Sequence, residues 1–127
     1  MIGLPSLSSL DRATGVRIWL AREPADMRQG FDRLAERAEA VTGQDPLGGH
    51  LFVFRGKGGD RLKILYWDRD GYALWYKRLE EGTFKLPRTD GTTASVELRG
   101  SELAMILDGI DLSSVKRGRR YNGGKKQ

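Results

Sequence analysis

The chain has 127 residues, 39% hydrophobic and 31% charged, which suits one globular domain with a single core. It has no run of about 20 apolar residues, which excludes a membrane-spanning helix, and no cysteine, which excludes disulfides and thiolate metal sites. The N-terminus has neither a basic start nor a continuous apolar stretch, so we expect no signal peptide and a cytoplasmic location.

The net charge of +5 is unevenly distributed along the chain. Residues 113–127 hold six basic groups and no acidic one, which leaves 16 basic against 17 acidic groups elsewhere. Residues 49–89 hold nine basic and five acidic groups, whereas residues 90–112 hold one basic and five acidic. This asymmetry indicates a polyanionic or acidic partner at the basic parts. The alternative is a solvated tail and ordinary surface charge.

The first predicted elements are a strand and a helix. Residues 16–20 (VRIWL) predict a short strand with Val16, Ile18 and Leu20 on one face. In the following helix we expect Asp26 as the N-cap, Gln29 as its capping-box partner and Gly43 just past the end. Gly30 would then lie inside the helix, at a cost of about 1 kcal/mol relative to alanine. The apolar stripe consists of Met27, Phe31, Leu34, Ala38 and Val41.

Three strands follow, in HLFVFR, RLKILYW and YALWYKRL. The links GKGGD and DRDG are glycine-containing turns too short for a parallel crossover, so these strands form an antiparallel meander. FKLP (84–87) and ASVEL (94–98) are candidates for one or two further short strands. A second helix is expected over 101–111, with Ser101 as its N-cap and an apolar stripe of Leu103, Ile106, Leu107 and Ile110.

This element order predicts an α+β fold. An antiparallel sheet of about four to five strands, centred on the meander, would carry one long and one short helix on one face. Residues 1–112 would form the single domain, and residues 113–127 a disordered basic tail. The sequence leaves open the oligomeric state and whether strand edges pair with another chain.

The meander is the main candidate for a binding surface, because it interleaves aromatic and basic residues. We expect one face to hold the core and the other to form a mixed surface of Arg61, Lys63, Trp67, Trp75 and Lys77. Lysine and arginine neutralise phosphates, and exposed aromatic rings stack on unpaired bases. The alternative is a packed sheet whose basic groups pair with Asp60, Asp68, Glu80 and Glu81. The candidate nucleic-acid-binding residues are Arg55, Lys57, Arg61, Lys63, Trp67, Arg69, Trp75, Lys77 and Arg78, with Lys116, Arg117, Arg119 and Arg120 in the tail.

Catalytic chemistry has little support in the sequence. His50 is the single histidine and has no metal-binding partner, so a structural role is expected. Asp68 and Asp70 lie in a turn, which favours aspartate for its backbone hydrogen bonds. GKGGD lacks Walker spacing, and LFVF lacks the remainder of an RNA-recognition motif. We therefore predict no enzyme, no metal site and no cofactor, and a nuclease centred on Asp68 and Asp70 is the least favoured alternative.

Three segments carry a resemblance to a known family: DMRQGFDRL (26–34), residues 49–87, and SELAMILDGID (101–111). Together they resemble the small accessory protein, TnpB, of the insertion-sequence group sixty-six. The family's MIxLP lead is followed here by an extra SLSSLDRAT, and the basic tail is not a fixed family feature. The family's DMRxGFD segment falls on Asp26, Arg28, Gly30 and Asp32, with Met27 and Phe31 interpreted as core. For Arg28 we expect a salt bridge to Glu23 or Asp32.

The resemblance implies a protein of a bacterial mobile element, in which a separate transposase carries the acidic-triad chemistry and this protein assists. It supplies no catalytic residues. We therefore expect a cytoplasmic, non-catalytic accessory factor whose partners are DNA, the transposase of the same element, or both. The alternative is an adaptor that docks the transposase without touching DNA.

Overall fold

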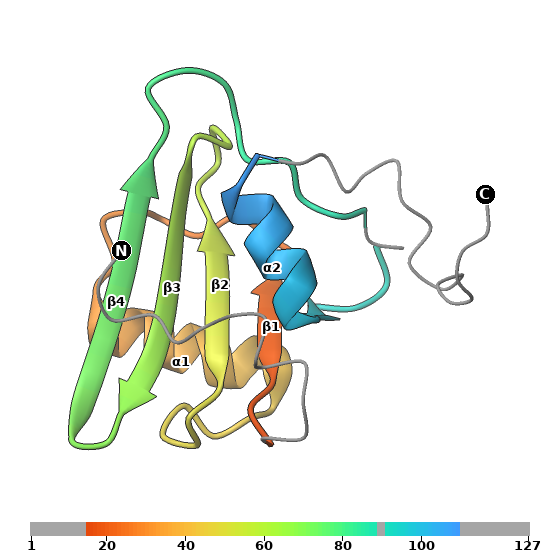
Figure 1. The fold of residues 1–127 in the computed structure, drawn as a ribbon. Helices are drawn as coiled ribbons and strands as arrows, with labels where there is room; N and C mark the ends of the chain where they lie inside the picture. The colour runs from red at the N-terminus through yellow and green to blue at the C-terminus, as the bar shows by residue number, and fades with distance from the viewer. Residues whose placement is uncertain (1–14, 89–90, 110–127) are drawn as a thin grey trace.

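A computed structural model describes residues 15–88 and 91–109 of the chain. The five strands of its described part form one sheet in the order β4-β3-β2-β1-β5 (Figure 1). Two helices pack on this sheet, which confirms the α+β class. The elements are β1 (Ile18–Ala21), α1 (Phe31–Thr42), β2 (Leu51–Arg55), β3 (Arg61–Asp68), β4 (Gly71–Arg78), β5 (Ser95–Leu98) and α2 (Gly100–Leu107).

The sheet is mixed. The meander β2-β3-β4 is antiparallel as predicted, and β5 pairs antiparallel with β1. β1 and β2 run parallel. The crossover through α1 returns the chain to the end of the sheet at which β1 begins, so β2 starts in the same direction. ASVEL supplies β5, whereas FKLP forms no strand.

The two helices cover opposite faces of the sheet, so the prediction that both lie on one face is wrong (Figure 1). Residues alternate along each strand: Leu51 and Val53 pack on the α2 side, whereas Phe52 and Phe54 pack on the α1 side. β2 is therefore buried on both sides and is apolar at nearly every position. A parallel β1-α1-β2 unit places α1 on one side of the sheet, and α2 fills the other.

α1 begins later than the sequence predicts. Its N-cap is Gly30, not Asp26, so Gly30 lies outside the helix. The predicted apolar stripe holds for Leu34 and Ala38, but Phe31 is 48% exposed and does not belong to the core. At the other end Gly43 has φ +71° and donates its N–H to the Glu39 carbonyl, as expected of a C-terminal glycine.

α2 is short and begins one residue before the predicted cap. Arg99, not Ser101, is the N-cap, and its backbone N–H donates to the Glu102 carboxylate at 2.8 Å. Leu103 and Ile106 are fully buried against the sheet. Burial of each side chain contributes about 1.5–3 kcal/mol to folding. Ile110 and residues 113–127, on which further expectations rest, lie outside the described residues.

Candidate nucleic-acid interface

The two tryptophans of the meander lie on opposite faces of the sheet. Trp67 is opposite Tyr72 in the β3–β4 ladder, and their rings meet edge to face with centroids 5.1 Å apart on the α1 side. Trp75 is opposite Ile64, and both pack on the α2 side. The single mixed surface predicted for these tryptophans and their basic neighbours is therefore wrong.

Lys63 has a structural position. Only 5% of the residue is exposed, and its Nζ donates to the carbonyl oxygens of Met27 at 2.8 Å and Gln29 at 2.7 Å. The same ammonium lies 4.6 Å from the centroid of the Tyr76 ring, close enough for a cation–π contact. A buried ammonium needs such partners. In this structure Lys63 binds the protein's own backbone and presents no charge to a ligand.

The segment of residues 22–30, which we name the motif loop, accepts hydrogen bonds from two arginines as well as from Lys63. Arg55 donates Nη2 to the Arg22 carbonyl at 2.9 Å. Arg37 of α1 donates Nη2 to the carbonyls of Glu23 at 3.1 Å and Pro24 at 3.0 Å. Arg37, Arg55 and Lys63 are thus three cationic side chains from three elements, and they bind five carbonyls of the motif loop. Two of these carbonyls, those of Met27 and Gln29, lie between Asp26 and the start of α1, and Lys63 satisfies them without a helix.

Asp26 and Arg28, the charged pair of the family motif, bind each other on the surface. The Arg28 guanidinium lies 2.8 Å from the Asp26 carboxylate, which also accepts the Arg28 backbone N–H at 2.9 Å. Arg28 is thus paired with Asp26, not with Glu23 or Asp32 as expected. The Arg28 hydrogen bonds lower the pKa of Asp26 to about 2. The Arg28 side chain is 91% exposed, and Asp32 lies in the first turn of α1, where negative charge is favourable.

The motif loop and the glycine-rich turn 56–60 face each other across a hollow of about 580 Å³, the loop–turn hollow. Its charges are balanced: Asp26 and Asp60 against Lys57 and Arg61. The Arg61 guanidinium also donates to the Tyr76 hydroxyl at 3.3 Å. Segments thirty residues apart in the sequence thus meet at one end of the sheet, which we call the turn end.

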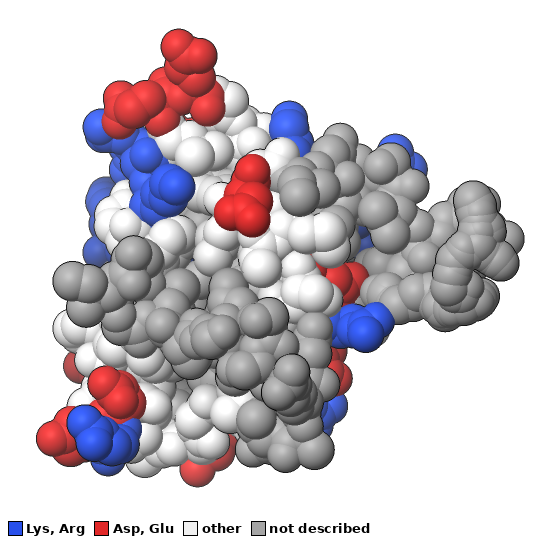
Figure 2. All heavy atoms as spheres, in the orientation of Figure 1, with Lys and Arg blue, Asp and Glu red and all other residues white. Residues whose placement is uncertain are grey.

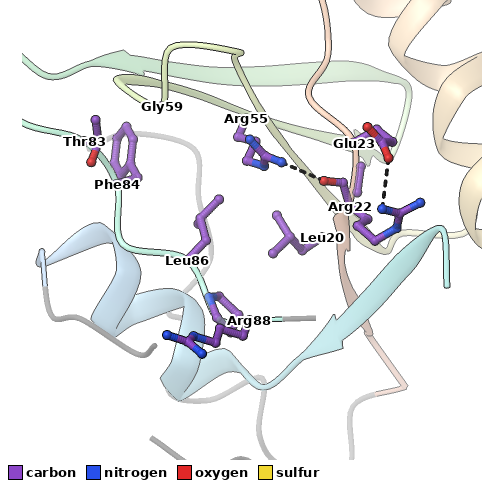
Figure 3. A pocket seen from close by; sticks show the side chains of 11 residues that line it. Leu20, Arg22, Glu23, Arg55, Gly59, Thr83, Phe84, Leu86 and Arg88 are labelled. Atoms are coloured by element: carbon purple, nitrogen blue, oxygen red, sulfur yellow. Dashed lines mark hydrogen bonds and ion pairs between the residues drawn. The ribbon is translucent and has the colours of Figure 1, made fainter. Parts of the chain in front are cut away.

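A second hollow at the turn end, of about 480 Å³, has a basic lining, and we name it the arginine hollow (Figure 3). Arg22, Arg55 and Arg88 line it with one carboxylate, Glu23, which lies 2.9 Å from Arg22. Its apolar residues include Leu20, Phe84 and Leu86. Arg22 and Arg88 were not among the predicted binding residues, because no local motif marks them. Their grouping depends on β1, β2 and the segment 83–88 meeting in space.

The remaining predicted cations are exposed but scattered. Lys57, Lys77 and Arg78 lie at the turn end, where Arg78 is 3.1 Å from Glu80. Arg69 lies at the opposite end of the sheet, in the β3–β4 turn with φ +60°, 3.9 Å from Asp68. Figure 2 shows basic side chains along the upper left border below an acidic tip, and mixed charges at the lower left corner. Lys116, Arg117, Arg119 and Arg120 lie outside the described residues, so binding by the tail stays a prediction.

The candidate catalytic residues lie at strand ends or in a turn. His50 accepts the Arg17 backbone N–H on its Nδ1 at 3.0 Å, a contact that orients the start of β1. Asp68 and Asp70 lie at the β3–β4 turn. Within residues 15–88 and 91–109, no three His, Cys, Asp or Glu residues gather to hold a metal ion. Neither described helix is long and apolar enough to cross a membrane.

Comparison with known proteins identifies the family. Residues 16–117 match the family described as IS66 Orf2 like protein. The chain belongs to this family. Two relatives from Sinorhizobium fredii (strain NBRC 101917 / NGR234) are the uncharacterized proteins y4hO and y4jC. The first is 40% identical, over 80% of this chain and 87% of the relative. The second is 38% identical, over 81% of this chain and 86% of the relative. No solved structure matches the chain.

Membership in the IS66 Orf2-like family indicates an accessory role in transposition and an association with the transposition machinery. The match spans every element of the described fold, from the start of β1 to beyond α2. The motif loop, the glycine-rich turn and the arginine hollow all lie inside it. The turn end therefore lies within the region that matches the family.

Proposed function

We propose that this IS66 Orf2-like chain is a non-catalytic accessory factor that binds the DNA of its insertion sequence at the turn end. The observation that carries the proposal is the arginine hollow, which three guanidinium groups and a single carboxylate line. Guanidinium groups bind phosphate through paired N–H donors, so a phosphodiester is the ligand that this lining suits.

Two of the three guanidinium groups in the arginine hollow have no carboxylate partner among the described residues. Among the described residues, neither Arg55 nor Arg88 lies within salt-bridge distance of a carboxylate. Arg55 is already oriented, because it donates one nitrogen to the Arg22 carbonyl. Arg88 is exposed on the rim. A fixed guanidinium beside a free one lowers the ordering needed to bind a phosphate.

Exposed lysines at the turn end add to the positive charge of the arginine hollow. Lys57 and Lys77 are exposed at the turn end and form no ion pair within the part of the chain that the structure describes. Each cation that neutralises a phosphate releases condensed counterions, so several weak contacts add up to useful affinity at low salt. The basic tail would add a second, independent contact. Such a factor acts in the bacterial cytoplasm, where the transposase of the same element also works.

Fluorescence anisotropy with labelled duplex and single-stranded DNA across a salt series tests the proposal. We expect affinity to fall as salt rises, and Arg88→Gln to lower it and reduce the salt slope by about one. Arg17→Gln is the matched control, because Arg17 is engaged with Glu97 at 2.9 Å and lies outside both hollows. Affinity that is indifferent to salt, or to Arg88→Gln, would contradict DNA binding at this hollow.

The same variants separate DNA binding from the adaptor alternative. If the turn end docks an acidic patch of the transposase, Arg88→Gln abolishes capture of the purified transposase and leaves DNA affinity unchanged. If the proposal holds, Arg88→Gln weakens DNA binding first, and capture of the transposase becomes dependent on added DNA.

A further inference from the structure

β4 is a long strand with one free edge. It pairs with β3 over all eight residues, without a bulge, and is the terminal strand of the sheet (Figure 1). It contains no proline and reads GYALWYKR, with aromatic and aliphatic residues through its middle. Long unbroken edges of this kind pair readily with another strand, and proteins usually shorten, bend or cover them. Among the described residues the edge of β4 is long, unbulged and unpaired, and its charged residues Lys77 and Arg78 lie only at one end.

The hydrogen-bonding phase of β4 shows which backbone groups are free. The Leu79 N–H donates to the Asp60 carbonyl at 2.8 Å, so the pair Asp60–Leu79 is a hydrogen-bonded pair of the antiparallel ladder. Such pairs alternate along a ladder. Odd-numbered residues of β4 therefore direct their N–H and C=O groups to β3. Tyr72, Leu74, Tyr76 and Arg78 direct theirs outward to the free edge.

We propose that a second copy of this chain pairs with this edge, β4 against β4, in an antiparallel two-fold arrangement with Leu74 opposite Leu74. The pairing joins the two sheets into one. A two-fold partner is self-complementary by construction, which suits a strand whose two ends carry opposite charges. The C-terminal end of β4 holds Lys77 and Arg78. The turn at its N-terminal end holds Asp68, Arg69 and Asp70; Arg69 lies 3.9 Å from Asp68, and Asp70 forms no ion pair among the described residues.

The outward phase and the charges fix the register. Two-fold pairing must place outward-directed residues opposite each other, so the axis passes through Leu74 or through Trp75. These two registers overlap β4 equally, over residues 71–77 or 72–78 of each copy. With Leu74 at the axis, Arg78 of each copy lies opposite Asp70 of the other. With Trp75 at the axis, Arg78 lies opposite Tyr72 and gains no charge partner. Charge therefore selects the Leu74 register.

The side chains agree with this register. Tyr72 of one copy lies opposite Tyr76 of the other on the α1 side, where Tyr76 is now 47% exposed. On the α2 side Ala73 lies opposite Trp75, a small residue beside a large one. Arg78 is engaged with Glu80 in the single chain, but both side chains are more than half exposed. An exposed pair of this kind exchanges partners at little cost.

Sedimentation equilibrium of the full chain and charge-reversed variants tests the proposal. We expect a dimer for the unchanged chain. Arg78→Asp and Asp70→Arg each raise the dissociation constant about tenfold, because like charges then meet at both ends of the paired strands. Combining the two substitutions restores the constant to within about threefold of the original. Lys77→Asp is the control: Lys77 faces Gly71 in this register, so Asp70→Arg does not rescue it.

A cysteine probe reads the register directly, since the chain has no cysteine of its own. Facing residues of a hydrogen-bonded pair have Cα atoms about 5.5 Å apart, within disulfide range. Leu74→Cys should therefore crosslink two copies under mild oxidation, whereas Ala73→Cys, which faces Trp75, should not. Circular dichroism verifies that each variant is folded. A chain that is monomeric at its highest soluble concentration, a dimer indifferent to both charge reversals, or equal crosslinking at the two positions would overturn the proposal.

Discussion

The Lys63 ammonium donates to the Met27 carbonyl at 2.8 Å, and this contact ties the middle of the sheet to the motif loop. A second bond, to Gln29, extends the tie to the residue before the cap of α1. One buried charge thus determines where the loop ends and the helix begins.

Lys63→Met should destabilise the fold by about 2–4 kcal/mol, because it removes two charge-assisted hydrogen bonds and leaves two carbonyls without partners. Urea denaturation measures the change in the free energy of unfolding. Lys77→Met, at an exposed lysine on the neighbouring strand, is the matched control and should remain within about 0.5 kcal/mol of the unchanged chain. Equal losses from the two substitutions would mean that the two hydrogen bonds of Lys63 contribute nothing to the free energy of unfolding.

The Asp26 carboxyl should titrate with a pKa of about 2 in an NMR pH series, against an ordinary value of 3.8. Its folded pKa lies below the unfolded one, so the carboxylate stabilises the fold above about pH 4, and this contribution disappears as pH falls through about 2. In Arg28→Gln the pKa should return toward the ordinary value, because the Arg28 side-chain hydrogen bonds are its main cause. An Asp26 titration that is the same in both proteins would refute the pairing.

Leu103→Ala should cost about 2–5 kcal/mol of stability, since Leu103 is fully buried between α2 and the sheet and its removal leaves a cavity. Thermal or urea unfolding of the purified variant measures it. Leu47→Ala is the control, because Leu47 is 51% exposed and its truncation should change little. A small effect at Leu103 would show that α2 is not part of the cooperative core.

The two glycines that flank α1 should respond oppositely to serine. At Gly30 a serine can cap the helix: φ is −108° and a Cβ would meet nothing within 4 Å, so stability should rise by a few tenths of a kcal/mol. At Gly43 φ is +71°, which a side chain disfavours, so Gly43→Ser should cost about 1–2 kcal/mol. Differential scanning calorimetry compares the pair. A loss at Gly30 would imply that the residue has contacts outside the single chain.

The strands could be predicted because their information is local. Period-two alternation and two short glycine-containing turns are enough to define β2, β3 and β4. The faces of Trp67 and Trp75 were also within reach: treating Arg69 and Asp70 as a two-residue turn places Asp68 opposite Gly71, and therefore Trp67 opposite Tyr72. Alternation within one strand does not show which of its faces continues onto the next strand; only the pairing across the turn decides it.

Other features depend on contacts between distant segments. The spacing around Asp26 fits a helix cap, but Lys63 binds the carbonyls of Met27 and Gln29, which a helix beginning there would have used. The placement of α1 and α2 on opposite faces depends on the parallel β1–β2 pairing, which no short motif encodes. Arg88 joins the arginine hollow through the path of the segment 83–88, so its neighbours cannot be read from the sequence around it.

Every atom that the three cations bind in residues 22–30 is a main-chain oxygen, and main-chain oxygens are the same for any amino acid. The backbone conformation of this segment therefore depends on the side chains at positions 37, 55 and 63, which lie outside it. Substitution of an exposed side chain within the segment can therefore change the chemistry of its surface and leave its backbone in place.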